Sequence, residues 1–197
     1  MLNLLTKPTD GTDGKTLIFD IETNGLYHDA TQIHCIAYYD SELDSIESFN
    51  DECDWKSPTG RGKGMSSPIV RAIQFIEQAS IVIGHNIIGY DLPIISKLYP
   101  FFNPRGLIID TLLLSRLYHP RLMQLDKDRN WPHMPLQLYG RHSLEAYGYR
   151  LGEYKGDYGK TTDWKEWSQE LEDYCIQDVA VTKKLCEHFR PYLSGSR

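Results

Sequence analysis

Four carboxylates and one tyrosine are the residues of this sequence whose types and spacing could do chemistry together. Asp20 and Glu22 stand two positions apart in the apolar run Thr16–Glu22. In a β-strand, side chains two positions apart point to the same face, so both carboxylates should project together. Adjacent carboxylates repel each other unless a positive charge lies between them. A solvated strand end would explain an Asp-x-Glu pair alone, but in so apolar a run a bound metal ion becomes a competing explanation.

The other members of the set are weaker signals when taken one at a time. Asp91 follows a short apolar run and a Gly-His-Asn loop, and alone it is explained as the cap of the helix that Pro93 opens. Asp178 lies in a late helical segment, and Tyr174 is one turn earlier on the same face. Alone, this pair indicates a core tyrosine beside a surface acid. The order of all five residues along the chain is what indicates a joint site.

The elements that must position these residues follow from hydrophobic periodicity and from turn and cap signals. Strands are predicted at 16–22, 33–39, 45–49, 81–83 and 107–109. Helices are predicted at 68–79, from Pro93 to about 98, from an N-cap at Asp110, at 143–149 and at 169–188, with an irregular stretch over 120–142. Strands first, then strands alternating with helices, predict an α/β sandwich with a mixed sheet. We expect a flexible leader over 1–15, one domain over 16–190 and a tail over 191–197.

Composition narrows the class of protein. The chain has 197 residues, of which 41% are hydrophobic and 24% charged, as in ordinary globular proteins, which disfavours a disordered chain. Its apolar runs are too short to span a membrane, and no signal peptide precedes the first strand, so we expect a cytoplasmic protein. The net charge of −6 disfavours broad electrostatic capture of nucleic acid. It does not exclude a nucleic-acid enzyme, because metal ions neutralise carboxylates at such a site.

Other motifs fail on spacing. No two of the four cysteines form a Cys-x-x-Cys pair, which disfavours a structural zinc site and predicts buried, idle thiols. The glycines of 60–64 have neither the spacing of a phosphate-binding loop nor that of a dinucleotide fingerprint. The same loop, 56–64, carries Lys56, Arg61 and Lys63. A solvated loop without a role explains this local positive charge as well as contacts to substrate phosphates do.

Five stretches carry a resemblance to a known family: Ile18–Leu26, Gly84–Asp91, Asp110–Leu117, Arg141–Gly152 and Asp173–Asp178. Together they resemble the DEDDy, or DnaQ-like, 3′→5′ exonucleases, most of all the proofreading domain that opens the family A DNA polymerases of T-odd phages. The stretches extend over nearly the whole chain from 16 to 185. Two of them lie outside the catalytic motifs, so chance spacing of carboxylates is a poor explanation. Departures from the family pattern are the polar leader, an enlarged loop over 51–67 and the absence of a polymerase domain after Arg197.

The resemblance implies a ribonuclease H-like fold, a five-stranded mixed sheet flanked by helices. It also implies that Asp20, Glu22 and Asp178 hold one divalent ion and that Asp20 and Asp91 hold a second. By the same resemblance, Tyr174 is expected to be the fifth catalytic residue. The substrate-binding residues that it implies are Thr23, Leu26, Asn86 and Tyr90, with Leu26 wedged between the last two bases.

The predicted activity is stepwise hydrolysis of DNA from a single-stranded or frayed 3′ end to nucleoside 5′-monophosphates. Oxygen ligands without Cys or His suit Mg²⁺ or Mn²⁺, and two such ions about 3.5–4 Å apart would activate water and stabilise the leaving oxygen. Tyrosine has an ordinary pKa of about 10, so Tyr174 would orient the water rather than deprotonate it. A 3′→5′ exoribonuclease and a non-catalytic module that holds single strands or docks a polymerase are the alternatives. A DNA polymerase is the expected protein partner.

Overall fold

The structure, a computed structural model, describes residues 14–52, 67–153 and 164–195. The strands of this part of the chain form one five-stranded mixed sheet in the order β3-β2-β1-β4-β5. They are β1 (Thr16–Thr23), β2 (Ile33–Asp40), β3 (Ser45–Asn50), β4 (Ile81–Gly84) and β5 (Leu107–Asp110). β1 lies at the centre, antiparallel to β2 and parallel to β4. All five predicted strands are therefore confirmed, together with the mixed sheet.

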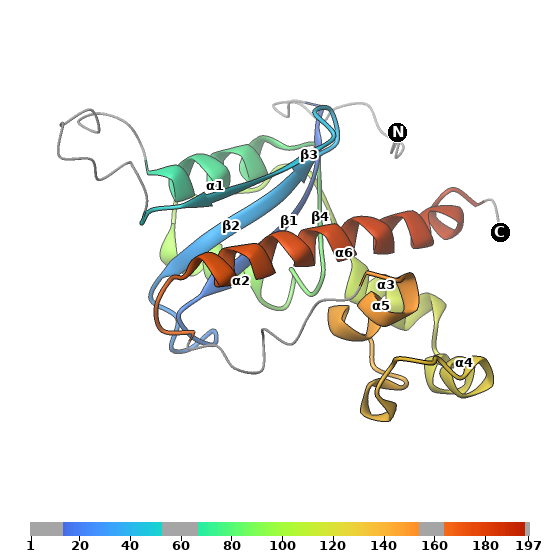
Figure 1. Cartoon of the computed structure of the whole chain (residues 1–197). Coiled ribbons are helices and arrows are strands. Elements are labelled where there is room, and N and C mark those ends of the chain that lie inside the picture. The colour runs from blue at the N-terminus through green and yellow to red at the C-terminus, as the bar shows by residue number, and fades with distance from the viewer. Residues whose placement is uncertain (1–13, 53–66, 154–163, 196–197) are drawn as a thin grey trace.

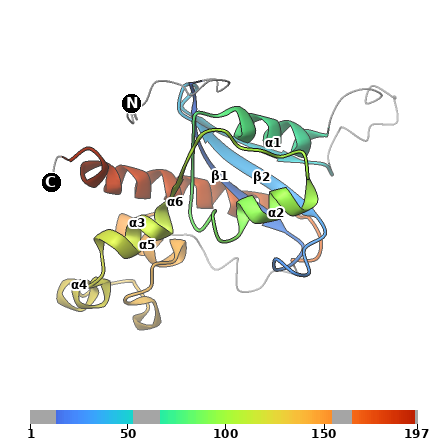
Figure 2. The ribbon, with the colours of Figure 1, turned by 180° about the vertical axis from the view of Figure 1, so that it is seen from behind.

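Helices cover both faces of the sheet (Figures 1 and 2). The long helix α6 (Gln169–Leu193) crosses one face, and α1 (Pro68–Gln78) and α2 (Asp91–Leu98) cover the other. Alternation along β1 divides the core: Phe19 and Ile21 pack in the cluster of α1 and α2, whereas Ile18 packs against α6 residues. The even positions of β1 thus face α6, and this direction includes Asp20 and Glu22.

A group of short helices lies beside the carboxyl half of α6 (Figure 1). It consists of α3 (Thr111–Tyr118), α4 (Leu122–Arg129), the 3-10 helix η1 (Leu136–Leu138) and α5 (Leu144–Leu151). A third core cluster joins this group to α6 through Leu122, Tyr147, Leu185 and Phe189. The short helices therefore rest on α6 and form one side of the space at the carboxyl end of β1 and β4.

Two helix predictions need correction. The stretch 120–142 was predicted to be irregular, but Leu122–Arg129 is helical and is followed by η1. α4 was missed because only Leu122 and Asp126 are buried in it, so it has no apolar stripe, and tertiary contacts hold it in place. The last helix was predicted to end at 188, but α6 continues through Pro191 to Leu193. Its final turn is held by ring contacts of Tyr192 with Tyr118 and Phe189.

The remaining predictions concern caps and cysteines. The side chains of Asp110 and Ser143 cap α3 and α5 as predicted. Cys35, Cys175 and Cys186 are buried free thiols. In the described part of the chain no helix is long and apolar enough to cross a membrane. Three parts of the sequence predictions lie outside the described residues. They are residues 1–13 of the expected leader, Cys53, and the basic loop 56–64 with Lys56, Arg61 and Lys63.

Candidate active site

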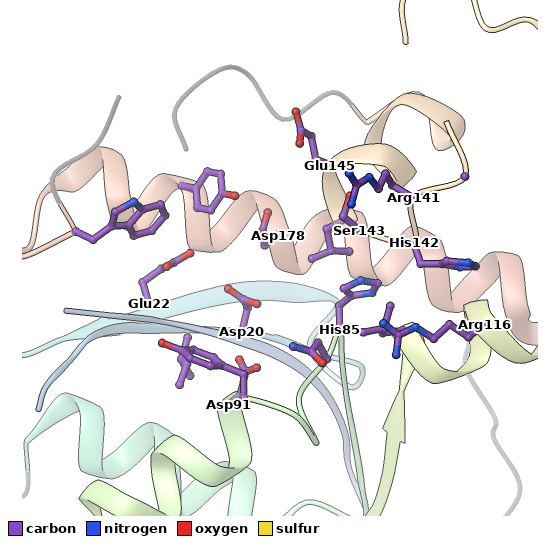
Figure 3. Close-up of a pocket in the computed structure, with 18 residues that line it drawn as sticks. Asp20, Glu22, His85, Asp91, Arg116, Arg141, His142, Ser143, Glu145 and Asp178 are labelled. Carbon is purple, nitrogen blue, oxygen red and sulfur yellow. The ribbon is translucent and has the colours of Figure 1, made fainter. Parts of the chain in front are cut away.

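One cavity of about 730 Å³ contains all five residues that the sequence indicated as a joint site. Its floor is the end of β1, with Asp20 and Glu22. α6 contributes Tyr174 and Asp178, and the start of α2 contributes Asp91. Figure 3 shows Asp20, Glu22 and Asp178 turned toward a common space between the sheet and α6. Residues that are 158 positions apart in sequence, Asp20 and Asp178, are thereby brought together.

Three of the carboxylates form a tight group. Asp20, Glu22 and Asp178 each offer one oxygen, and these three atoms lie within 4.8 Å of one another. β1 presents the first two on the α6 side, and the turn of α6 that follows Cys175 presents the third. Asp178 is only 7% exposed, whereas Asp20 and Glu22 are half-buried. Three like charges at this separation are unfavourable unless protons or a cation compensate them.

Asp91 lies in the same cavity but is not part of that three-residue group. Its side chain is 4% exposed. Burial raises the pKa of the Asp91 carboxyl to about 7, and the charges of Asp110 and Asp178 add to the increase. Hydrogen bonds from the backbone of Asp91 and Ile21 act in the opposite direction. Asp91 is the first residue of α2 and does not cap it, because the N-cap residue is Tyr90.

Tyr174 stands half-buried in the cavity, one turn before Asp178. Its ring meets the ring of Trp164 edge-on, with centroids 5.9 Å apart. Cys175, next to it, donates its thiol hydrogen to the carbonyl oxygen of Asp20 at 3.4 Å and to the Oδ2 atom at 3.7 Å. Burial raises the pKa of the Cys175 thiol well above its ordinary value, so the thiol remains a donor at neutral pH. It therefore helps to hold Asp20 in place.

The turn after β1 is tied to α2 by a tyrosine. The Tyr90 hydroxyl donates to the carbonyl oxygen of Gly25 at 2.7 Å and lies 2.5 Å from the Thr23 hydroxyl oxygen. The next residue, Leu26, is 77% exposed, and it lines a smaller cavity of about 310 Å³ with Thr23 and Tyr90. That cavity also includes Glu22, so it adjoins the carboxylate group. Thr23 and Tyr90 thus position an exposed apolar side chain beside the acids.

Asn86 lines the main cavity and is exposed, in a turn with left-handed backbone. Its φ is 65°, a left-handed conformation that Asn tolerates better than most residues. Asp110 accepts hydrogen bonds from the backbone N–H of Asn86 at 3.0 Å and of Ile88 at 3.1 Å. This buried acid, which also caps α3, holds the loop that carries Asn86 and leads to Tyr90 and Asp91.

The carboxylate group fits a divalent cation by its chemistry. All three potential ligands are hard carboxylate oxygens, and no Cys or His belongs to the group. Mg²⁺ and Mn²⁺ prefer such ligands. The separation of the oxygens is compatible with ligands around one ion, and Asp91 in the same cavity offers a fourth carboxylate. The residues present therefore fit a divalent metal centre.

Comparison with known proteins agrees with this geometry. A model of the RNase H superfamily matches residues 17–190, which include every carboxylate of the cavity. The chain belongs to the RNase H superfamily. Within this superfamily it is 32% identical over 194 residues to the DNA-directed DNA polymerase of Enterobacteria phage T3, covering 87% of this chain and 26% of the polymerase. It is likewise 32% identical over 193 residues to the polymerase of Escherichia phage T7, with the same coverage. The chain thus spans about a quarter of the length of these polymerases.

Solved structures share the RNase H-like fold. Brucella melitensis NrnC superimposes with a TM-score of 0.60 at 17% identity, covering 94% of this chain and 78% of NrnC. Exonuclease I gives a TM-score of 0.57 at 16% identity, covering 93% of this chain and 43% of that protein. The EXO domain of Aedes aegypti Nibbler gives 0.54 at 13% identity, covering 94% and 87%. These likenesses confirm the predicted fold, which several exonucleases share.

Several lining residues were not among the predicted site residues. Trp164, Arg116, Arg141 and His142 line the main cavity. Arg141 and His142 lie in one of the stretches that carry the family resemblance, but no spacing pattern in the sequence distinguishes them from ordinary surface residues. Trp164 lies in a polar segment before the last helix. An aromatic side chain in a polar segment was the one feature of the sequence that could have indicated its place in the site. Their place in the site depends on how α3, α5 and α6 pack together.

Proposed function

We propose that this chain is a metal-dependent 3′→5′ exonuclease that shortens DNA one nucleotide at a time. The observation that carries the proposal is the approach of the Asp20, Glu22 and Asp178 oxygens to within 4.8 Å, with Asp91 and Tyr174 in the same cavity. In the two-ion arrangement, Asp20, Glu22 and Asp178 would hold one ion, and Asp20 and Asp91 a second. Such ions lower the pKa of water and neutralise charge on the departing 3′-oxygen. A Mg²⁺-bound structure of NrnC, which shares this fold, supports the choice of cation.

The protein groups around the carboxylates have separate tasks in this proposal. The Tyr174 hydroxyl, next to Asp178 on α6, orients the attacking water by a hydrogen bond. Leu26 meets the terminal base from the adjoining cavity, because its exposed side chain is held beside Glu22 by the Tyr90 hydrogen bonds. Asn86 lines the main cavity, where the terminal sugar would enter. Water attacks the phosphorus and the bond to the 3′-oxygen breaks, which leaves a 3′-hydroxyl on the shortened strand and the phosphate on the released nucleoside, so the product is a 5′-monophosphate.

The position of the carboxylates favours a single strand. The cavity lies between the sheet and α6, and carboxylates line it on several sides, so paired bases must separate before the terminal phosphodiester reaches Asp20. Contacts with sugar, phosphate and base faces carry no sequence code. We therefore expect cleavage of frayed or single-stranded 3′ ends with little preference for base identity.

Similarity to the phage T3 and T7 DNA polymerases favours DNA as substrate and a DNA polymerase as partner. In that setting the chain would remove misincorporated nucleotides or degrade DNA in the cytoplasm of the host cell. A structure of NrnC bound to pGG shares this fold. Short oligonucleotides, including RNA, are therefore the second substrate class that we consider for this chain.

The test is to incubate the purified protein with end-labelled DNA and RNA strands of the same sequence, with Mg²⁺ and with a chelator. We expect Mg²⁺-dependent cleavage that is faster on DNA than on RNA. Faster cleavage of RNA than of DNA would change the assigned substrate from DNA to RNA. Binding of both strands without cleavage would identify a non-catalytic module. Adding a blunt duplex as a third substrate tests the preference for unpaired ends.

A further inference from the structure

The main cavity has two sides of opposite charge. Figure 3 shows Asp20 and Asp178 lying between Glu22 on one side and the basic side chains of Arg116 and Arg141 on the other. All five residues line the same cavity. Glu22 and Leu26 both line the smaller cavity, and the terminal base would occupy that cavity. The two arginines therefore stand at the opposite end, on the side from which the rest of the strand must enter.

Arg141 is held rigidly by its backbone while its side chain stays exposed. Arg150 donates from Nη1 to the carbonyl oxygen of Arg141 at 2.8 Å. The neighbouring N–H of Gly140 donates to Asp126 at 2.7 Å. Asp126 and Arg150 form a salt bridge of 2.6 Å with side chains only 2% and 6% exposed. A buried ion pair with several hydrogen bonds thus fixes the segment that carries Arg141.

Arg116 is exposed in the last turn of α3, and a hydrogen bond joins its helix to the Arg141 segment. The Ser115 hydroxyl and His142 Nδ1 lie 2.6 Å apart. Burial lowers the pKa of His142, and the nearby charges of Arg150 and Arg116 lower it further. At neutral pH His142 is therefore an uncharged link, and the positive charge of this wall comes from the arginines.

The guanidinium groups of Arg116 and Arg141 have no polar partner among the described residues. Among the described residues, no hydrogen bond or salt bridge engages the side chain of Arg116 or Arg141, although Glu145 lines the same end of the cavity. An arginine in a last helical turn is explained by the helix dipole alone. Two unpaired arginines on linked elements, facing one cavity in a chain of net charge −6, are not explained in that way.

We propose that Arg116 and Arg141 together bind the phosphate one nucleotide upstream, on the 5′ side, of the bond that is cleaved. This inference rests on the proposed function, because it takes the carboxylates as the place of cleavage. Guanidinium groups donate pairs of hydrogen bonds to phosphate oxygens, so two unpaired arginines that line one cavity can form a phosphate subsite. In a long strand that phosphate is an internal phosphodiester, and in a dinucleotide it is the 5′-terminal phosphate. The shortest good substrate is then a 5′-phosphorylated dinucleotide.

The experiment compares a thymidine dinucleotide that carries a 5′-phosphate with the same dinucleotide that carries a 5′-hydroxyl. We expect the native chain to cleave the phosphorylated form with a kcat/KM at least about 10-fold higher, as two charge-assisted contacts permit. In Arg116→Gln/Arg141→Gln the preference should fall to near 1, mainly through KM. Arg71→Gln/Arg121→Gln removes two exposed arginines that line neither cavity, and it should retain the preference.

A long single strand distinguishes the two sources of the phosphate. Its cleavage should not depend on a 5′-phosphate, yet its KM should rise in the Arg116→Gln/Arg141→Gln variant. A preference for the phosphorylated dinucleotide that survives this double substitution would overturn the subsite. So would a native chain that cleaves both dinucleotides equally well.

Failure of the proposed function would look different. In that case no oligonucleotide is cleaved by any variant, and fluorescence anisotropy in a chelator still measures binding of the two dinucleotides. Tighter binding of the phosphorylated form that is lost only in the Arg116→Gln/Arg141→Gln variant would support the subsite without nuclease activity. Equal binding of both forms would overturn it.

Discussion

Replacing Asp91 by Asn should stabilise the metal-free protein at neutral pH and remove much of the pH dependence of its stability. Asp91 is 4% exposed, and burial raises its carboxyl pKa to about 7, whereas an exposed aspartate has a pKa of about 3.9. Below about pH 4 both the folded and the unfolded chain hold the proton. Between about pH 4 and 7 the unfolded chain has released it while the folded chain keeps it, so stability falls as pH rises. Above about pH 7 both states are ionised and the loss is complete.

The size of the loss follows from the two pKa values. Each unit of difference corresponds to about 1.4 kcal/mol, so the full effect is at most about 4 kcal/mol. Relaxation around the charge and coupling to neighbouring groups reduce it, which leaves an expected gain for Asp91→Asn on the order of 2 kcal/mol at pH 8. Asparagine keeps the shape of the side chain and removes the charge.

The assay is urea unfolding of both proteins in a chelator at pH 5 and pH 8. The stability of the native chain should fall between the two pH values by more than that of Asp91→Asn. Asp128→Asn serves as a control, because Asp128 is exposed on α4 and accepts only from Gln124. Mg²⁺ should stabilise the native chain more than Asp91→Asn, since a ligand that binds only the folded state shifts unfolding. Equal pH dependence in the native chain and Asp91→Asn would refute the reasoning.

Five other substitutions test the roles of single residues. Asp20→Ala, Glu22→Ala and Asp178→Ala should each abolish most cleavage yet leave circular dichroism unchanged, and near-normal rates in any two of them would disprove the metal assignment. Tyr174→Phe keeps the ring against Trp164 and removes one hydrogen bond, so kcat should fall about 10- to 1000-fold with KM nearly constant, and an unchanged kcat would return Tyr174 to a packing role. Leu26→Ala removes a side chain that is 77% exposed, so its folding should be unaffected while cleavage of duplex ends falls more than cleavage of single strands, as measured by gel assay. Equal losses on both substrates would argue against a wedge.

The acidic half of the site was predictable because it depends on local periodicity. Asp20 and Glu22 share a face since strand side chains alternate, and Tyr174 and Asp178 share a face since they are one helical turn apart. The hydrophobic residues around them identified the strand and the helix. The resemblance to DnaQ-like exonucleases then ordered these pieces around one sheet.

The basic half was not predictable because it depends on contacts between distant segments. Asp126 was expected in an irregular stretch, yet it is buried by partners at Trp131, Gly140 and Arg150. That salt bridge positions the segment of Arg141, and packing of α3 places Arg116 in the same cavity. No period or motif in the sequence indicates which surface arginines will face a shared cavity.

The most direct test of the central claim is the direction and metal dependence of cleavage of a 5′-labelled single-stranded DNA. The account predicts a ladder of products that shorten by one nucleotide from the 3′ end with Mg²⁺, and none with a chelator or with Asp178→Ala. Immediate release of the 5′ label as a mononucleotide, or an equal ladder with Asp178→Ala, would contradict it.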